Sequence, residues 1–239
     1  RTKIDVAAGN IAIADLIDVE DVVVCITTDD CIKRVALSEY KKQARGGVGV
    51  TSGETKEDLL MQSMFSASTH DDLLCFTDTG RVFSIKVFEL PEASRTARAR
   101  PIINFINLKD GEKICAYLPI KGRGKQQVFL NFLSKNGIVK RAALKEYARI
   151  NQGGIIAVKV KEGDSVVSVL TTKGIDDLLL VTHLGNAIRF SELEIRISGR
   201  QGQGVCGAKL EKNDYIVGGV AVPMKFDHDG DTVTSDKEL

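Results

Sequence analysis

A pattern of about fifty residues recurs four times along this 239-residue chain, and it limits the possible folds more than any other feature. Each repeat contains an apolar run, a tight turn, a basic strand-like segment, a loop with glycine or arginine, and two further apolar runs. The turns align at Asp30, Gly80, Gly137 and Gly185, at spacings of 50, 57 and 48 residues. Turns rich in Asp, Asn and Gly are typical of β-hairpins. Four strands in a repeat of this length are typical of a propeller or a close relative.

The sequence therefore predicts an all-β fold, because helical periodicity is weak throughout. The first strands are expected at Asp21–Thr27, Asp72–Thr77, Val128–Ser134 and Asp177–Thr182, and the second strands begin at Cys31, Arg81, Ile138 and Ala187. The third runs are Val48–Val50, Ile102–Leu108, Gly154–Val160 and Val205–Leu210. The fourth runs are Leu59–Phe65, Lys113–Ile120, Ser165–Thr171 and Tyr215–Val222.

One domain is expected over residues 21–222, with repeats at about 21–71, 72–125, 126–175 and 176–222. Residues 1–20 are predicted to be a lead-in segment that supplies a closing strand. Residues 223–239 are predicted to be a polar, acidic tail or a connector to further blades. The Asp-rich stretch 227–231 lacks the spacing and the distal glutamate of an EF-hand, which favours a connector over a calcium site. Because the chain starts at Arg1, it is expected to be a piece of a longer protein.

Composition limits the function classes. The chain is 43% hydrophobic and 27% charged, as expected of a folded domain, and no apolar run approaches a membrane span. The 33 basic and 32 acidic residues nearly cancel, so a nucleic-acid role requires the positive charge to gather on one surface. Five cysteines occur singly, without a CxxC pair, which favours free thiols in a cytoplasmic protein.

The sequence does not predict an enzyme. The three histidines are far apart, and no GxSxG, HExxH or GxxxxGK[ST] motif occurs. The glycine-rich stretch 199–204 does not open a helix, and it occupies the same place in its repeat as the loop at 43–49. An aromatic content of 5% without tryptophan argues against single-stranded nucleic acids and against a sugar-binding propeller. No metal or cofactor site is expected in this domain.

The loop at 43–49 combines a glutamine, nearby cations and two adjacent glycines. Glycine turns leave backbone N–H groups open to phosphate oxygens, and cations neutralise phosphate charge. The loop residues that we expect to contact DNA are Gln43, Arg45, Gly46, Gly47 and Gly49, preceded by Lys41 and Lys42. A solvated hairpin loop is the alternative interpretation.

A column of cations supports this hypothesis. Alignment of the repeats on their turns gives Arg34, Ser84, Arg141 and Arg189 in one column and Lys33, Phe83, Lys140 and Ile188 in the column before it. We expect these cations, with those of the following loops, to form a basic rim that holds duplex DNA by its phosphates. The predicted rim comprises Lys33, Arg34, Lys41, Lys42, Arg81, Arg95, Arg98, Arg100, Lys140, Arg141, Lys145, Arg149, Arg189 and Arg200, with Arg196 nearby. The alternative is that edge strands carry Lys and Arg to prevent aggregation.

Three stretches resemble the C-terminal domain of the gyrase A protein, which is part of DNA gyrase, a bacterial type II topoisomerase. They are residues 37–40 leading into 43–49, residues 73–77 with 80–82, and residues 90–95 through 98–102. The family's loop reads Gln-Arg-Arg-Gly-Gly-Lys-Gly, so Ala44 and Val48 replace two of its cations here. The resemblance implies a β-pinwheel, a propeller-like disc of four-stranded antiparallel blades that exchange strands. Family discs usually have six blades, whereas four full repeats are visible in this sequence.

The resemblance also implies a function. The disc would wrap double-stranded DNA with positive writhe, independently of sequence, and present the transported segment so that gyrase introduces negative supercoils. The domain would have no activity alone, since the catalytic tyrosine and the ATPase lie elsewhere. Its partners would be the remainder of gyrase A and the gyrase B protein, in a heterotetramer that uses ATP and Mg²⁺. The isolated domain is expected to be monomeric, cytoplasmic and nucleoid-associated, without membrane contact.

Two alternatives remain. The C-terminal domain of the topoisomerase IV protein that corresponds to gyrase A has a related disc, which selects substrates rather than wrapping strongly. The substitutions at Ala44 and Val48 are compatible with it. A propeller that acts as a protein scaffold would explain the repeats but not the basic column.

Overall fold

The computed structural model describes residues 16–40, 60–121, 127–226 and 232–233 of the chain. Strands dominate the described residues, which contain no α-helix. The strands are β1 (Asp21–Thr27), β2 (Cys31–Ala36), β3 (Met61–Ser68), β4 (Asp72–Thr77), β5 (Arg81–Lys86), β6 (Arg100–Pro101), β7 (Ile114–Ile120), β8 (Phe129–Ser134), β9 (Ile138–Ala143), β10 (Ile155–Ile156), β11 (Val166–Thr172), β12 (Asp177–Thr182), β13 (Ala187–Ser191), β14 (Val205–Cys206), β15 (Ile216–Val222), β16 (Lys225–Phe226) and β17 (Thr232–Val233). The 3₁₀ turns are η2 (Leu37–Glu39), η3 (Val87–Glu89), η4 (Ile102–Asn104), η5 (Leu144–Tyr147) and η6 (Glu192–Glu194).

The chain forms two compact units, residues 1–72 with 85–104 and residues 73–84 with 105–239. The first unit holds one antiparallel sheet, in the order β3-β1-β2-β6. Its core is built on β1 and β2, where Val24, Ile26, Ile32 and Val35 are fully buried. The second unit carries the sheets β10-β5-β4-β7, β11-β8-β9-β14 and β13-β12-β15, except that β4 begins and β5 ends in the first unit.

The predicted all-β architecture of repeated antiparallel sheets is confirmed. The first strands begin at or within one residue of their predicted positions, and the second strands begin at the predicted residues. The turn residues Asp30, Gly80, Gly137 and Gly185 all have positive φ, and each amide donates to the carbonyl three residues earlier. This backbone conformation is the one that made Gly, Asn and Asp informative in the sequence.

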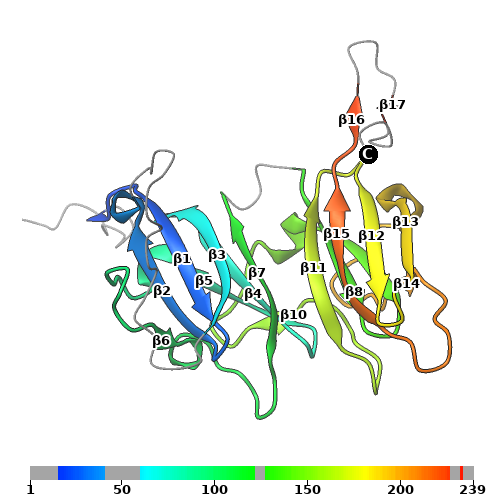
Figure 1. The fold of residues 1–239 in the computed structure, drawn as a ribbon, viewed down its shortest axis with the longest axis horizontal. Coiled ribbons are helices and arrows are strands. Elements are labelled where there is room, and N and C mark those ends of the chain that lie inside the picture. Colours follow the sequence, from blue (N-terminus) through cyan, green and yellow to red (C-terminus); the bar gives the residue numbers. More distant parts are fainter. Residues whose placement is uncertain (1–15, 41–59, 122–126, 227–231, 234–239) are drawn as a thin grey trace, which may run out of the picture. The chain divides into compact units, whose positions relative to one another are not determined.

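Strand exchange joins the repeats, as the pinwheel resemblance implies. Each repeat supplies its first, second and fourth strands to its own sheet, and the second, third and fourth repeats supply their short third strand to the sheet of the preceding repeat. Thus β6 pairs with β2, β10 with β5 and β14 with β9 (Figure 1). In the second and third repeats, the carbonyl of the turn glycine accepts hydrogen bonds from the residues that follow the exchanged strand of the next repeat. The carbonyl of Gly80 accepts from Ala157 and Val158, and that of Gly137 accepts from Gly207 and Ala208.

The fourth sheet differs from the prediction of four strands, because within the described part of the chain nothing pairs with the outer edge of β13. In the first three sheets the strand at this edge comes from the next repeat, as β14 does for the sheet of β9. The predicted third run of the first repeat, residues 48–50, lies outside the described residues. The lead-in residues 1–15 and most of the predicted tail also lie outside them.

Two apolar clusters stabilise the second unit. One joins the second and third sheets through Leu74, Phe76, Leu130, Phe132 and Tyr147. The other joins the third and fourth sheets through Leu133, Val139, Leu178, Leu180 and Ile216. These clusters pack successive sheets of the second unit against one another. The described residues include no helix long and apolar enough to cross a membrane.

Candidate nucleic-acid interface

Among the described residues, the loops after β5 and β13 run along the outer edges of β2 and β9, each the second strand of the preceding repeat. Beside β2, Arg34 N donates to Pro91 O at 2.9 Å and Ala93 N donates to Arg34 O at 3.0 Å. Beside β9, Ser198 N donates to Arg141 O at 2.9 Å. Beside β5, the Arg81 Nη2 atom donates to Gly153 O at 2.6 Å. The loops beside β2 and β9 therefore share backbone hydrogen bonds to the neighbouring strand, whereas the loop beside β5 is joined to it by the Arg81 side chain.

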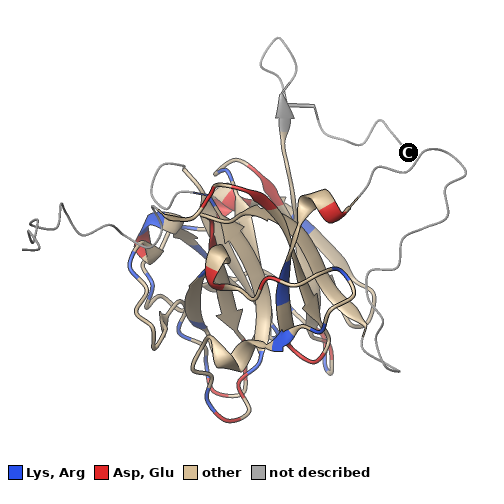
Figure 2. Cartoon of the chain, turned by 90° about the vertical axis from the view of Figure 1, so that its left-hand side faces the viewer, with Lys and Arg blue, Asp and Glu red and all other residues tan. Residues whose placement is uncertain are grey.

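These loops carry exposed cations. Those with exposed side chains are Arg98, Arg100, Lys145, Arg149 and Arg196, and those that are half-exposed are Arg95 and Arg200. Arg95 and Arg98 belong to the loop beside β2, which leads into Arg100 at the start of β6; Lys145 and Arg149 belong to the loop beside β5, and Arg196 and Arg200 to the one beside β9. Figure 2 shows lysine and arginine interleaved with acidic residues on the loops, as expected for a chain with nearly balanced charge. Because their side chains are exposed to solvent, these cations can reach a phosphate.

Two lysines of the predicted rim are buried. Lys33 is 4% exposed and Lys140 is 1% exposed, and their Nζ atoms donate to backbone carbonyls of the loops. Burial lowers the pKa of Lys33, while burial together with the nearby Arg200 charge lowers the pKa of Lys140 to about 8. Neither ammonium group is available to a phosphate. This corrects the prediction that both lysines face DNA.

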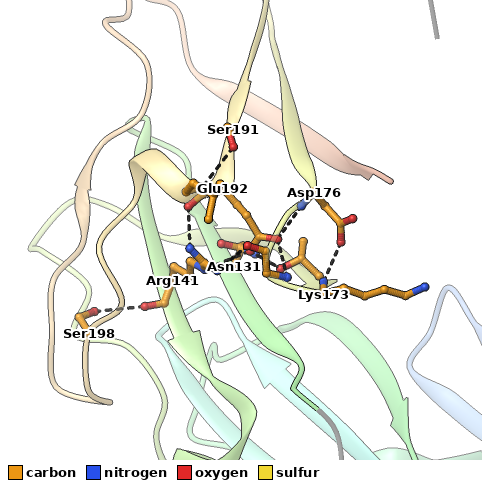
Figure 3. A network of polar contacts seen from close by, with 10 residues as sticks. Asn131, Arg141, Lys173, Asp176, Ser191, Glu192 and Ser198 are labelled. Atoms are coloured by element: carbon orange, nitrogen blue, oxygen red, sulfur yellow. Dashed lines mark hydrogen bonds and ion pairs between the residues drawn. The ribbon is translucent and has the colours of Figure 1, made fainter. Parts of the chain in front are cut away.

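Arg141 is also buried, and its charge is used inside the protein (Figure 3). Its Nε lies 3.0 Å from Glu192 Oε2, and its Nη1 and Nη2 atoms donate to the carbonyls of Glu192 and Gly174. The carboxylate of Glu192 further accepts hydrogen bonds from Thr172, Gly174 and Asp176. The network ties the third sheet to η6 of the fourth repeat. Arg141 therefore has a structural place, which corrects its assignment to the rim.

Arg81 and the two remaining arginines of the column, Arg34 and Arg189, are paired with acids. Arg81 lies 2.7 Å from the buried Glu112, Arg34 lies 2.9 Å from Glu92, and Arg189 lies 2.8 Å from Asp177. Burial alone would raise the pKa of Glu112, but hydrogen bonds from Lys109, Thr79 and Thr77 and the Arg81 charge lower it overall. The Arg81 pair is consequently a structural link. Arg34 is as enclosed as Arg81, with 16% of its side chain exposed, whereas 30% of the Arg189 side chain is exposed.

The predicted loop residues Lys41, Lys42, Gln43, Arg45, Gly46, Gly47 and Gly49 lie outside the described residues. Their assignment stays a prediction. Among the described residues, no group of three or more His, Cys, Asp or Glu side chains is placed to hold a metal ion.

The burial of Lys33 and Lys140 could have been predicted from the residues aligned with them. On a strand, successive side chains point to opposite faces, so adjacent columns cannot both face outward. The column of Lys33 and Lys140 contains Phe83 in the second repeat, and Phe83 is 1% exposed. A phenylalanine in that column indicates a buried position, where a lysine must find acceptors within the protein.

Comparison with known proteins then identifies the family. The family described as DNA gyrase C-terminal domain, beta-propeller, matches residues 21–58, 71–115, 132–173 and 176–223, one stretch for each repeat. The chain belongs to this family. The match covers most of the chain, and the family's beta-propeller description agrees with the repeated antiparallel sheets.

Relatives and solved structures agree with this family. The DNA gyrase A protein of Helicobacter pylori is 43% identical over 93% of this chain and 27% of its own length. That of Salmonella typhimurium is 40% identical over 91% of this chain and 25% of its own length. The chain thus spans about a quarter of the length of the curated relatives that it matches.

Two solved structures in this family are similar to the chain. The C-terminal domain of DNA topoisomerase IV has a TM-score of 0.73 at 32% identity, over 87% of this chain and 62% of that one. The C-terminal domain of DNA gyrase A has a TM-score of 0.65 at 26% identity, over 84% of this chain and 65% of that one.

Proposed function

We propose that this chain is the DNA-wrapping domain of a gyrase A protein. In this proposal it binds duplex DNA independently of sequence, through phosphate contacts from the exposed loop cations and from residues 41–49. Wrapping with positive writhe presents the transported segment to the rest of the enzyme, which introduces negative supercoils. The partners are the remainder of gyrase A and the gyrase B protein, in a cytoplasmic, nucleoid-associated enzyme that uses ATP and Mg²⁺ outside this domain. The isolated domain is monomeric and has no catalytic activity.

The observation that carries the proposal is a set of exposed arginines in three successive repeats. Arg98, Arg149 and Arg196 are each exposed on the loop between the second and third strands of their repeat. Exposed cations that recur with the repeat suit a ligand of repeating negative charge, and the phosphates of duplex DNA are such a ligand. Membership of the gyrase family supports the same ligand. The loss of Lys33, Lys140 and Arg141 from the predicted rim leaves the loop cations as its main part.

Charge removal tests the DNA contacts. The triple variant Arg98→Ala, Arg149→Ala, Arg196→Ala should weaken duplex binding and reduce the slope of log K against log salt by about three, since each phosphate contact contributes about one. The matched control changes Lys109, Lys161 and Lys212 to alanine. These lysines are exposed in the three equivalent turns before β7, β11 and β15, and their substitution removes the same amount of positive charge. Equal effects of the two triples would reject the loops as the binding surface.

The linking number tests the wrapping. Relaxed circular DNA is incubated with the chain and resealed by a nicking-closing enzyme, and we expect a positive shift that grows with protein concentration. Binding without any shift would favour the topoisomerase IV type of domain, to which the chain is also similar. An absence of salt-dependent binding would reject the proposal and favour a protein scaffold.

A further inference from the structure

The ammonium group of Lys33 is enclosed by the backbone of the loop beside β2. Its Nζ lies 2.7 Å from Arg95 O, 2.8 Å from Ala97 O and 3.3 Å from Ser94 O. Three carbonyls around one ammonium match its three donors. Because Lys33 is almost fully buried, these contacts replace the water that an exposed lysine would bind. The loop that they hold also carries Arg95 and Arg98, and it leads into Arg100 of β6.

Lys140 repeats this arrangement in the second unit, two repeats further along the chain. Its Nζ lies 2.5 Å from Arg200 O and 2.9 Å from Ala157 O. The hydroxyl of Tyr147 donates to the same Ala157 carbonyl at 2.9 Å, which fixes that acceptor. The Nζ atom also lies over the ring of Phe132, 5.5 Å from its centroid. Lys140 thus joins the third repeat to the loop that carries Arg200.

The second repeat has Phe83 at the aligned position, and its loop is held in another way. The Phe83 ring packs under Gly154, where a Cβ atom would fall 2.7 Å from the ring. Arg81 then donates to the neighbouring carbonyl of Gly153. In all three repeats the residue at this strand position therefore contacts the backbone of the incoming loop. Lysine holds it by hydrogen bonds and phenylalanine by packing.

Burial of an ammonium group costs more free energy than burial of the phenylalanine that stands at the aligned position of the second repeat. Transfer of a charged group from water is unfavourable unless hydrogen bonds compensate, and the lowered pKa of Lys140 reflects that loss of water. Such a charged group is compatible with the fold when its hydrogen bonds fix the position of backbone carbonyls that apolar packing alone does not fix. The carbonyls of Arg95 and Arg200 are held inward, while the side chains of the same residues remain half-exposed.

We propose that Lys33 and Lys140 are positioning residues that hold the backbone of the basic loops, so that Arg95 and Arg200 are presented to duplex DNA in a fixed shape. The part concerning DNA rests on the proposed function, whereas the part concerning the loop does not. Neither lysine contacts DNA in this arrangement. Their effect on binding passes through the loop arginines.

The test compares Lys140→Met, Lys33→Met and the matched control Lys212→Met, an exposed lysine whose loss removes the same charge. Hydrogen exchange measures the loops directly. Gly202 N donates to Gly199 O and Ala97 N donates to Ser94 O, so these amides report loop order. We expect exchange of the Gly202 amide to become at least about tenfold faster in Lys140→Met, with the β8 amides unchanged. The Ala97 amide should respond in the same way to Lys33→Met.

Duplex binding gives the second measurement. Each buried-lysine variant should weaken DNA binding more than the control does and lower the salt slope by about one, as expected for the loss of one arginine–phosphate contact. The inference would be overturned if hydrogen exchange of the loop amides and the salt slope of DNA binding were the same as in Lys212→Met. The proposed function would then still stand. If the parent chain binds no DNA, the proposed function fails, and the exchange data alone decide whether the lysines anchor the loops. Should Lys140→Met fail to fold, Lys33→Met tests the same idea in the other unit.

Discussion

The carboxylate of Glu192 lies 3.0 Å from the Nε atom of Arg141, and both side chains are buried. In the other repeats the residues aligned with Glu192 are Leu37, Val87 and Leu144, so this joint alone has an acid where the others have an aliphatic side chain. Buried ion pairs contribute little net stability, but removal of one partner leaves an uncompensated charge. The joint between the third and fourth repeats therefore depends on both members being present.

Glu192→Gln should reduce the free energy of unfolding by about 3–5 kcal/mol, because Arg141 loses its counter-charge while remaining buried. Urea titration followed by circular dichroism measures the change. Glu194→Gln is the control, since Glu194 is exposed in the same η6 turn and should change stability by less than about 0.5 kcal/mol. Equal effects of the two changes would mean that Glu192 is not part of a stabilising pair.

The turn glycines separate two effects of an added side chain. Gly137 and Gly185 have φ of +79° and +86°, so alanine at either position should cost about 1–2 kcal/mol of backbone strain. A Cβ atom at Gly137 would also fall 2.6 Å from Ala208 O, whereas none of the compared heavy atoms lies within 4 Å at Gly185. Thermal unfolding of the two alanine variants should therefore show Gly137→Ala to be less stable by a further 1 kcal/mol, roughly. Identical losses of stability in the two variants would show that the segment around Ala208 shifts away from the added Cβ atom without a measurable loss of free energy.

Much of this fold could be predicted because its local signals agree with one another. Gly80 and Gly137 have positive φ, which glycine adopts freely, so the glycines in the sequence mark the turns. The apolar runs between the turns locate the strands. Periodicity cannot reveal that β10 belongs to the sheet of β5, because strand exchange is a long-range pairing. Only the family resemblance implied it.

The site was harder to predict, because charge alone does not state which way a side chain faces. Lys33 and Arg34 are adjacent on β2, so alternation places them on opposite faces of the sheet. The acceptors of Lys33 lie about sixty residues away in the next repeat, and Glu192 is 51 residues from Arg141. Contacts at such separations depend on how the repeats pack. The loop cations Arg98 and Arg149 were easier, since exposed loops leave Arg and Lys in water.

Thiol reactivity should follow burial. At pH 8, iodoacetamide should modify the exposed Cys206 first and leave Cys75 and Cys115 unmodified in the folded chain, as measured by mass spectrometry of peptides. Burial raises the pKa of Cys75, and burial aided by the Asp78 charge raises the pKa of Cys115 to about 12, so little reactive thiolate forms at either site. Labelling in urea is the control and should modify all five cysteines. Early labelling of Cys75 in the folded chain would contradict its burial.

Alkaline pH should stabilise the joint at Lys140. The pKa of this lysine is about 8 in the folded chain, because of burial and the Arg200 charge, against an ordinary value of 10.5. Between these two values the unfolded chain binds more protons, so the contribution of Lys140 to the free energy of unfolding rises with pH, by on the order of 1–3 kcal/mol. Urea unfolding at pH 7, 8, 9 and 10 measures it as the difference between the parent chain and Lys140→Met.

Other groups change stability in the opposite direction over the same range, so the difference is more informative than the parent curve. Burial raises the pKa values of Tyr147 and Cys75, which the unfolded chain therefore ionises more readily, and stability falls as pH rises. Both residues remain in Lys140→Met, and the contribution of Cys75 cancels in the comparison. Tyr147 shares the Ala157 carbonyl with Lys140, so its contribution cancels only in part. A difference that increases from pH 7 to 9 would confirm a charged, buried Lys140 at neutral pH. A flat difference would mean that its ammonium group keeps an ordinary pKa and reaches water.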